Sequence, residues 1–181
     1  MIATIMTLPN YFPEIFVFRV CLSVVLLGLL LALSQLLYKK AMVNKIQRNT
    51  LMILSLYVVV MLYYTVIGRY SQTYYRYDIE LFGTIRSLTE QFTINEFSQL
   101  AVNLLMMMPV SFMLMIILSS KYRAFRVFYI TVAYIFFIEL LQFFTRTGTL
   151  QLDDIIMNTI GGFIGILLYF FIKAIYKKKR E

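Results

Sequence analysis

Long apolar runs separated by short polar segments dominate the sequence. A helix needs about 20 residues to cross ~30 Å of hydrocarbon, and five windows meet that length: 15–37, 51–67, 99–118, 127–145 and 155–172. Nearly all charged residues lie outside these windows. The pattern predicts an all-α integral membrane protein, built as a single bundle of about five transmembrane helices.

Composition agrees with this prediction. Of the 181 residues, 61% are apolar and 14% are charged, too few charges to coat a soluble globule of this length. Histidine is absent and Cys21 is the single cysteine, which excludes a histidine-based metal site and an intrachain disulfide framework. We expect no metal and no cofactor.

The basic residues predict the orientation. The net charge is +8, and Lys and Arg in short loops stay on the cytoplasmic side. Twelve of the seventeen basic residues fall on one side of the predicted topology: Lys39, Lys40, Lys45, Arg48, Lys121, Arg123, Arg126, Lys173, Lys177, Lys178, Lys179 and Arg180. This places the N-terminus outside and the C-terminus in the cytoplasm. Charge beside membrane ends favours contact with membrane lipid, and we expect no nucleic-acid partner.

The same topology divides the chain into four parts. They are an extracytoplasmic N-terminal segment (1–14), a first transmembrane helix with a basic cytoplasmic loop (15–56), a transmembrane domain (57–172) and a basic cytoplasmic tail (173–181).

Polar residues inside three windows predict a site, because a charged residue at mid-membrane costs roughly 2.5–3.5 kcal/mol. Residues three, four and seven apart share a helix face. Three stripes follow from this spacing: Glu96, Gln99 and Asn103; Glu139, Gln142 and Arg146; and Asp154, Asn158, Gly161, Gly162 and Gly165. All three lie in the outer half of the predicted bundle. They predict an outward-facing pocket whose binding residues are Asn103, Glu139, Gln142, Arg146, Asp154 and Asn158.

Two roles remain open for Glu139. It could act as a proton carrier or acid/base group, with Asp154 as the other catalytic candidate. It could instead pair with Arg146, Arg69 or Arg86 and fix how the helices dock.

Other residues indicate helix packing. Gly161, Gly162 and Gly165 allow another helix to approach closely. Pro109 removes the hydrogen bond to the Leu105 carbonyl and predicts a kink there, with the carbonyl facing the pocket or satisfied by Ser111.

Several motifs together resemble the VanZ-like family. They are the run Asn103 to Pro109, Glu139-Leu140-Leu141-Gln142, Arg146, Asp154 to Thr159, and Gly161-Gly162-Phe163-Ile164-Gly165, within a similarity spanning roughly 57–172. The resemblance implies a bacterial cytoplasmic-membrane protein, multi-pass, related to a founding member that confers low-level resistance to the lipoglycopeptide teicoplanin. The chain departs from the family in having Gln151 where an acidic residue is common, with Asp153 as a possible substitute, and in a longer loop at 147–150.

Two classes of function follow. In the first, a non-catalytic pocket binds an amphiphile, such as a lipid-linked cell-wall precursor or the lipoglycopeptide, with Arg146 and Arg69 or Arg86 meeting its anionic group. In the second, an intramembrane enzyme uses Glu139 or Asp154 as a general base on a lipid headgroup or surface polymer. The sequence favours binding and leaves the oligomeric state open.

Overall fold

The computed structural model describes residues 12–83, 86, 90 and 92–179. The predicted N-terminal segment (1–14) therefore lies almost entirely outside the described residues, and so does the side chain of Glu96.

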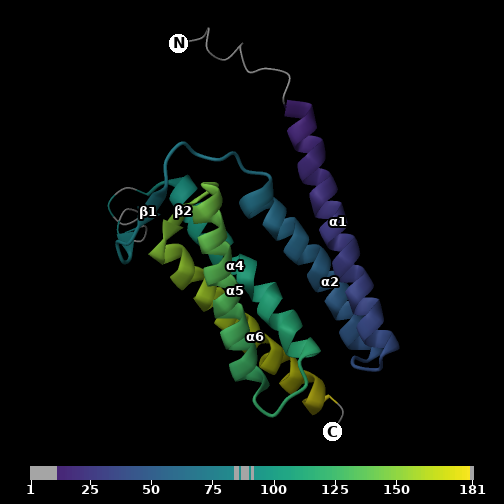
Figure 1. Ribbon diagram of the computed structural model, residues 1–181. Helices are drawn as coiled ribbons and strands as arrows, with labels where there is room; N and C mark the ends of the chain where they lie inside the picture. Colours follow the sequence, from purple (N-terminus) through teal and green to yellow (C-terminus); the bar gives the residue numbers. More distant parts are fainter. Residues whose placement is uncertain (1–11, 84–85, 87–89, 91, 180–181) are drawn as a thin grey trace.

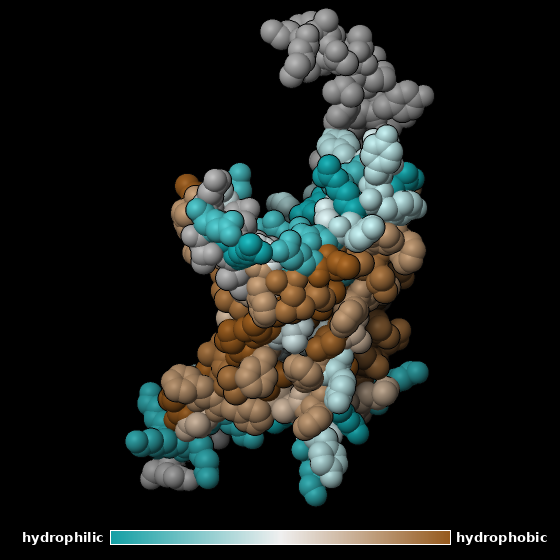
Figure 2. All heavy atoms as spheres, turned by 90° about the vertical axis from the view of Figure 1, so that its left-hand side faces the viewer, coloured by the Kyte–Doolittle hydropathy of each residue, from teal (hydrophilic) through white to brown (hydrophobic). Residues whose placement is uncertain are grey.

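The described residues contain five long helices: α1 (Phe12–Lys39), α2 (Lys45–Leu62), α4 (Ile94–Ile117), α5 (Arg123–Thr145) and α6 (Leu152–Lys178). All five are long and apolar enough to cross a membrane. The helices α4, α5 and α6 form a bundle, and the α1–α2 hairpin leans against it through α2 and α4 (Figure 1). Figure 2 shows the surface that results, an apolar belt between two hydrophilic ends. The protein is a multi-pass membrane protein, as predicted.

Local hydrogen bonds determine where α2 begins. The Asn44 side chain accepts a hydrogen bond from the Gln47 amide at 2.9 Å, and the Gln47 side chain accepts one from the Asn44 amide at 2.9 Å. This reciprocal arrangement is a capping box, which satisfies two amides that a helix start leaves free. Gln47 also donates to the Ile117 carbonyl at 2.8 Å, so the α1–α2 turn is tied to the end of α4.

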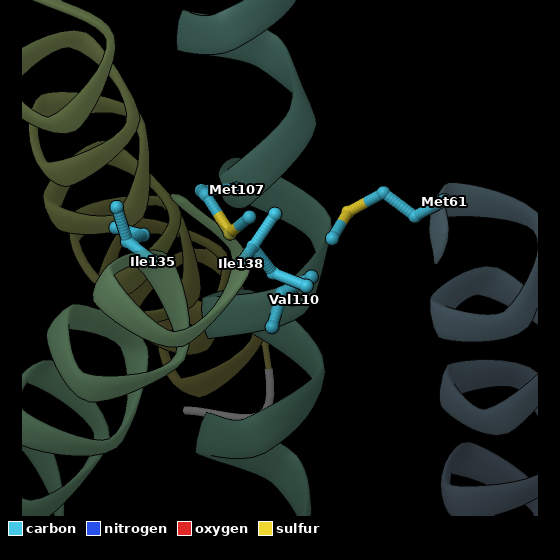
Figure 3. Close-up of a cluster of buried hydrophobic side chains, with 5 residues drawn as sticks. All are labelled: Met61, Met107, Val110, Ile135 and Ile138. Atoms are coloured by element: carbon cyan, nitrogen blue, oxygen red, sulfur yellow. The ribbon is translucent and has the colours of Figure 1, made fainter. Parts of the chain in front are cut away.

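The apolar core lies where α2, α4 and α5 meet. Met61 of α2 reaches toward Met107 and Val110 of α4, and Ile135 and Ile138 of α5 complete the cluster (Figure 3). All five side chains are at most 5% exposed. Lipid is as apolar as these residues, so such a cluster stabilises the bundle through close packing rather than through escape from water.

The closest helix contact joins α4 and α6. A Cβ atom on Gly161 would collide with the Leu104 carbonyl oxygen, and one on Gly165 would collide with the Met108 carbonyl oxygen. The two contacts are one turn apart on both helices, so the α6 backbone lies directly against the α4 backbone. Gly162 faces α5 instead, where an added Cβ would lie 2.8 Å from the Thr131 Cγ2 atom.

Pro109 lies inside α4, which continues through it to Ile117. One turn earlier the Met106 carbonyl accepts a hydrogen bond from the Tyr57 hydroxyl at 2.9 Å. Ser111 forms a 2.9 Å hydrogen bond with Thr131 of α5. The expected kink at the Leu105 carbonyl stays a prediction.

Three small elements were not predicted. The last turns of α2 widen into a π-helix, η1 (Tyr63–Ile67), which Gly68 closes by donating to the Tyr63 carbonyl at 2.7 Å. Two three-residue strands, β1 (Arg76–Asp78) and β2 (Thr149–Gln151), pair in parallel, with Tyr77 opposite Leu150. The pairing attaches the α2–α4 connection to the α5–α6 turn.

Candidate functional site

A cavity of about 490 Å³ lies at the end of the bundle where η1 and α5 finish and α4 and α6 begin. Four predicted binding residues line it: Asn103, Glu139, Gln142 and Asp154. Further polar residues that line it are Thr65, Arg69, Gln72, Gln99, Thr147 and Gln151. Three helices thus bring their polar positions together at one end of the bundle.

The π-helix supplies one wall. Its wide turn places the Thr65 carbonyl where Gln142 of α5 donates to it at 3.3 Å, while the Thr65 hydroxyl donates back to the Met61 carbonyl at 2.8 Å. Single π turns within α-helices occur frequently at functional sites. Arg69 follows the turn and lines the cavity, with its Nε donating to the Tyr64 carbonyl at 3.2 Å.

Glu139 is the most buried carboxylate of the cavity, at 4% exposure. The backbone of Gln151 in β2 lies close to it, and the charges of Arg69 and Asp154 also influence it. Its Oε2 atom is buried and has no hydrogen-bond partner among the described residues. A buried oxygen without a partner is costly, so this atom is an unsatisfied acceptor beside the cavity.

Asp154 lies in the first turn of α6, where the helix dipole favours a negative charge. Gln99 of α4 holds it in place, because its Nε2 lies 3.3 Å from both carboxylate oxygens and 2.6 Å from Oε1 of Gln151. Asn103, one turn further along α4, also approaches this carboxylate. Its buried Nδ2 lacks a hydrogen-bond partner of good geometry among the described residues.

Asp153 has a different structural role from its neighbour Asp154. It is 5% exposed, and its Oδ1 accepts a hydrogen bond from the Phe82 amide at 2.7 Å. Phe82 has a positive φ of 61°, a conformation that a bulky residue adopts only when its surroundings hold it there. Asp153 therefore anchors the α2–α4 connection, whereas the Gln151 side chain accepts a hydrogen bond from Gln99 at the cavity.

The structure differs from the sequence-based expectation for Arg146. Continuing the helical stripe placed Arg146 beside Gln142, but α5 ends there and Arg146 takes a left-handed conformation with φ of 58°. Its guanidinium lies 5.3 Å from the ring centre of Tyr75 and donates to the Thr73 carbonyl at 3.4 Å. Arg146 does not line the cavity, because the change of backbone conformation turns it off the helix face.

The structure also differs from the expectations for Arg86 and Asn158. Arg86, a candidate partner of Glu139, pairs with Glu90 at 3.1 Å and with Glu80 at 3.8 Å on the exposed connection. Asn158 lies one turn deeper in α6 than Asp154 and does not line the cavity; it is 3% exposed, and its Oδ1 has no hydrogen-bond partner among the described residues. Of the three arginines proposed for Glu139, Arg69 is the one at the cavity.

Sequence reasoning gave little weight to several residues of the cavity. Arg69 appeared as one of three possible partners, and Thr65 and Gln72 were not singled out. The helical spacing of Gln99 and Asn103 was a usable signal, but a π turn leaves no periodic pattern in the sequence.

The fold and the cavity define a class: a five-helix membrane protein with a buried carboxylate and a second carboxylate at one end of its bundle. The VanZ/LLP1 family profile matches residues 49–173, more than half of the chain. The protein belongs to the VanZ/LLP1 family. Membership suggests a membrane protein linked to glycopeptide resistance. Neither the curated proteins nor the solved structures gave a significant match.

Proposed function

We propose that this protein acts in the bacterial cytoplasmic membrane and contributes to low-level resistance to glycopeptides and lipoglycopeptides of the teicoplanin type. Its cavity binds the polar part of an amphiphile, either a lipid-linked cell-wall component or the drug itself. The observation that carries this proposal is the convergence of Asn103, Gln142 and the two carboxylates on one cavity at one end of the bundle.

The charge distribution supports an outward-facing cavity. The α1–α2 turn, the α4–α5 turn and the C-terminus lie at one end of the molecule, and β1 and β2 lie at the other (Figure 1). The first end carries the basic clusters. Because Lys and Arg are retained in the cytoplasm, the end with the cavity faces outward.

The lining suits an amphiphile. Val102, Met106 and Ile138 provide apolar wall, and Gln72 and Gln99 add amides that can donate and accept hydrogen bonds. An aliphatic wall with a few placed polar groups is typical of sites for such ligands. Of the three arginines that the sequence offered for an anionic group, Arg69 is the one that lines the cavity.

A second candidate function rests on the two carboxylates. Glu139 and Asp154 share one cavity and repel each other electrostatically. Two carboxylates in different surroundings are an arrangement used for general acid and base catalysis. In this alternative the protein modifies a lipid headgroup or a surface polymer.

Glu139→Gln and Asp154→Asn separate the two functions, with Glu80→Gln as control because Glu80 is an exposed carboxylate outside the cavity. Each variant is brought to equal membrane abundance, and glycopeptide susceptibility is measured together with binding of teicoplanin and of a lipid-linked cell-wall precursor. Loss of both resistance and binding in the two cavity variants, with the control unchanged, supports recognition. Loss of resistance with retained binding supports catalysis. Unchanged resistance in both cavity variants refutes the site.

Cysteine labelling tests the orientation. In a Cys21→Ala background, Tyr74→Cys reports on the end with the cavity and Lys40→Cys on the basic end; both positions are exposed. A membrane-impermeant maleimide applied to intact cells should label the first variant and spare the second. The reverse pattern would place the cavity in the cytoplasm.

A further inference from the structure

A second site lies at the opposite end of the bundle, between the α4–α5 turn and α6. A polar recess of about 200 Å³ is lined by Ser120, Lys121, Tyr122 and Arg123 together with Phe170. An apolar groove of about 310 Å³ lies next to it, lined by Phe125, Phe128, Tyr129, Phe163 and Ile166. Ala124 and Phe125 belong to both. The two hollows therefore form one trough with a basic mouth and an apolar floor.

The mouth carries positive charge that the nearby chain does not neutralise. Lys121 and Arg123 line it, and the sequence has no acidic residue at 15–77, 97–138 or 155–180. These ranges contain the elements at this end of the molecule, including the α1–α2 turn. Among the described residues at this end, an anion would thus meet two cations without competition from a carboxylate; Glu181 lies outside the described residues.

Arg123 is held in a fixed position at the mouth. Its Nη1 donates to the Leu118 carbonyl at 3.4 Å, and its guanidinium lies 4.8 Å from the ring centre of Tyr169. Its Nε is buried and has no hydrogen-bond partner among the described residues. Arg123 also begins α5, whose N-cap residue Tyr122 provides no side-chain cap, so the first amides of α5 add to the attraction for an anion.

The floor faces the lipid. Phe125 is 67% exposed and Phe163 is 50% exposed, and both line the groove on the apolar belt of the molecule. The groove therefore lies where an acyl chain would run, and the mouth lies at the level of the headgroups.

We propose that this trough binds one anionic phospholipid of the leaflet at the basic end. The phosphate lies against Lys121, Arg123 and the start of α5, and an acyl chain lies along Phe125 and Phe163. A lipid fits better than a soluble phosphate because the apolar groove continues directly from the mouth. An anionic lipid fits better than a zwitterionic one because the two cations have no acidic neighbour in the part of the chain that the structure describes. This site lies at the opposite end from the cavity and does not depend on its function.

The test uses the full chain in nanodiscs and purified in detergent, with phosphatidylglycerol and phosphatidylcholine as probes and native mass spectrometry as readout. Lys121→Gln removes one exposed cation from the mouth, and Lys40→Gln is the matched control on another basic turn at the same end. We expect Lys121→Gln to weaken phosphatidylglycerol binding roughly fivefold, the usual contribution of one Lys near an anionic surface. Lys40→Gln should leave the tightest binding event unchanged.

Two further arms complete the test. Phe163→Ala should weaken phosphatidylglycerol binding while protein folding, followed by circular dichroism, stays intact. Inorganic phosphate at the same concentration as the lipid should not displace it. Equal loss in the Lys121 and Lys40 variants would overturn the proposal in favour of diffuse surface attraction. Equal binding of phosphatidylcholine, or displacement by inorganic phosphate, would also overturn it.

Discussion

Gly161→Ala is the sharpest test of the α4–α6 contact. The added methyl group would meet the Leu104 carbonyl oxygen, which belongs to the backbone of a helix and cannot rotate away as a side chain does. Relief requires α4 and α6 to separate along their shared length. The Gly165 contact one turn further would then open as well.

The expected loss of stability depends on which atoms must move to make room for the methyl group. Extra methylenes in a packed core cost typically 1–3 kcal/mol when side chains can adjust. Here the neighbour is backbone, so we expect the upper end, about 3 kcal/mol, which is more than a hundredfold in the folding equilibrium constant. Gly162→Ala should cost less, about 1–2 kcal/mol, because its neighbour at 2.8 Å is a methyl group of the Thr131 side chain.

Gly28→Ala is the matched control. Gly28 lies in α1, and nothing lies within 4 Å of the position that its Cβ would take. Alanine there should be neutral or stabilising by up to about 1 kcal/mol, because it favours the helix over glycine. The same substitution is thus expected to have opposite signs at two positions.

The assay is reversible unfolding in mixed micelles, titrated with a denaturing detergent and followed by circular dichroism. The expected order of stability is Gly28→Ala, then wild type, then Gly162→Ala, then Gly161→Ala. If Gly161→Ala unfolded at the same detergent fraction as Gly28→Ala, α6 would not rest against the α4 backbone and the packing described here would be refuted.

Two further predictions address single hydrogen bonds. Tyr57→Phe removes the donor to the Met106 carbonyl and should lower the free energy of unfolding, measured in the same titration, by about 0.5–1.5 kcal/mol. Tyr64→Phe, at an exposed position, is the control and should leave the free energy of unfolding unchanged. Equal effects of the two substitutions would contradict a stabilising role for the Tyr57 hydrogen bond. Asp153→Ala frees the Phe82 amide and should speed limited proteolysis within 76–83, whereas a cleavage rate equal to wild type would show that the connection is held by other contacts.

The helices were predictable because their signal is local. In a membrane protein, a run of about 20 apolar residues has few alternatives to a membrane-spanning helix. The helices of the structure extend beyond the predicted windows by a few residues at the majority of the window ends. The spacing of Glu139 and Gln142 on one helix, and of Gln99 and Asn103 on another, follows directly from 3.6 residues per turn. The four side chains line the same cavity because the end of α5 and the start of α4 meet there.

The remaining features depend on single backbone conformations and on pairings between distant segments, which leave no periodic pattern in the sequence. Arg146 lies off the helix face of Glu139 and Gln142 because it takes a left-handed backbone conformation at the end of α5. The pairing of Tyr77 with Leu150 joins strands far apart in sequence, and two three-residue strands carry too little pattern to be recognised alone. Asn44 and Gln47, in contrast, form a capping box whose spacing was readable in the sequence.

The wide turn from Tyr63 to Ile67 holds one residue more than a regular helix would place in that rise. Deleting a single residue there would let ordinary i to i−4 bonding resume, while the chain on either side of the turn would keep nearly its present direction because the extra residue is absorbed within the wide turn. Thr65 lies inside the wide turn, so the deletion would move its carbonyl out of reach of the Gln142 side chain. A shortened chain would thus gain a more regular helix and lose the hydrogen bond that joins this helix to α5 at the cavity wall.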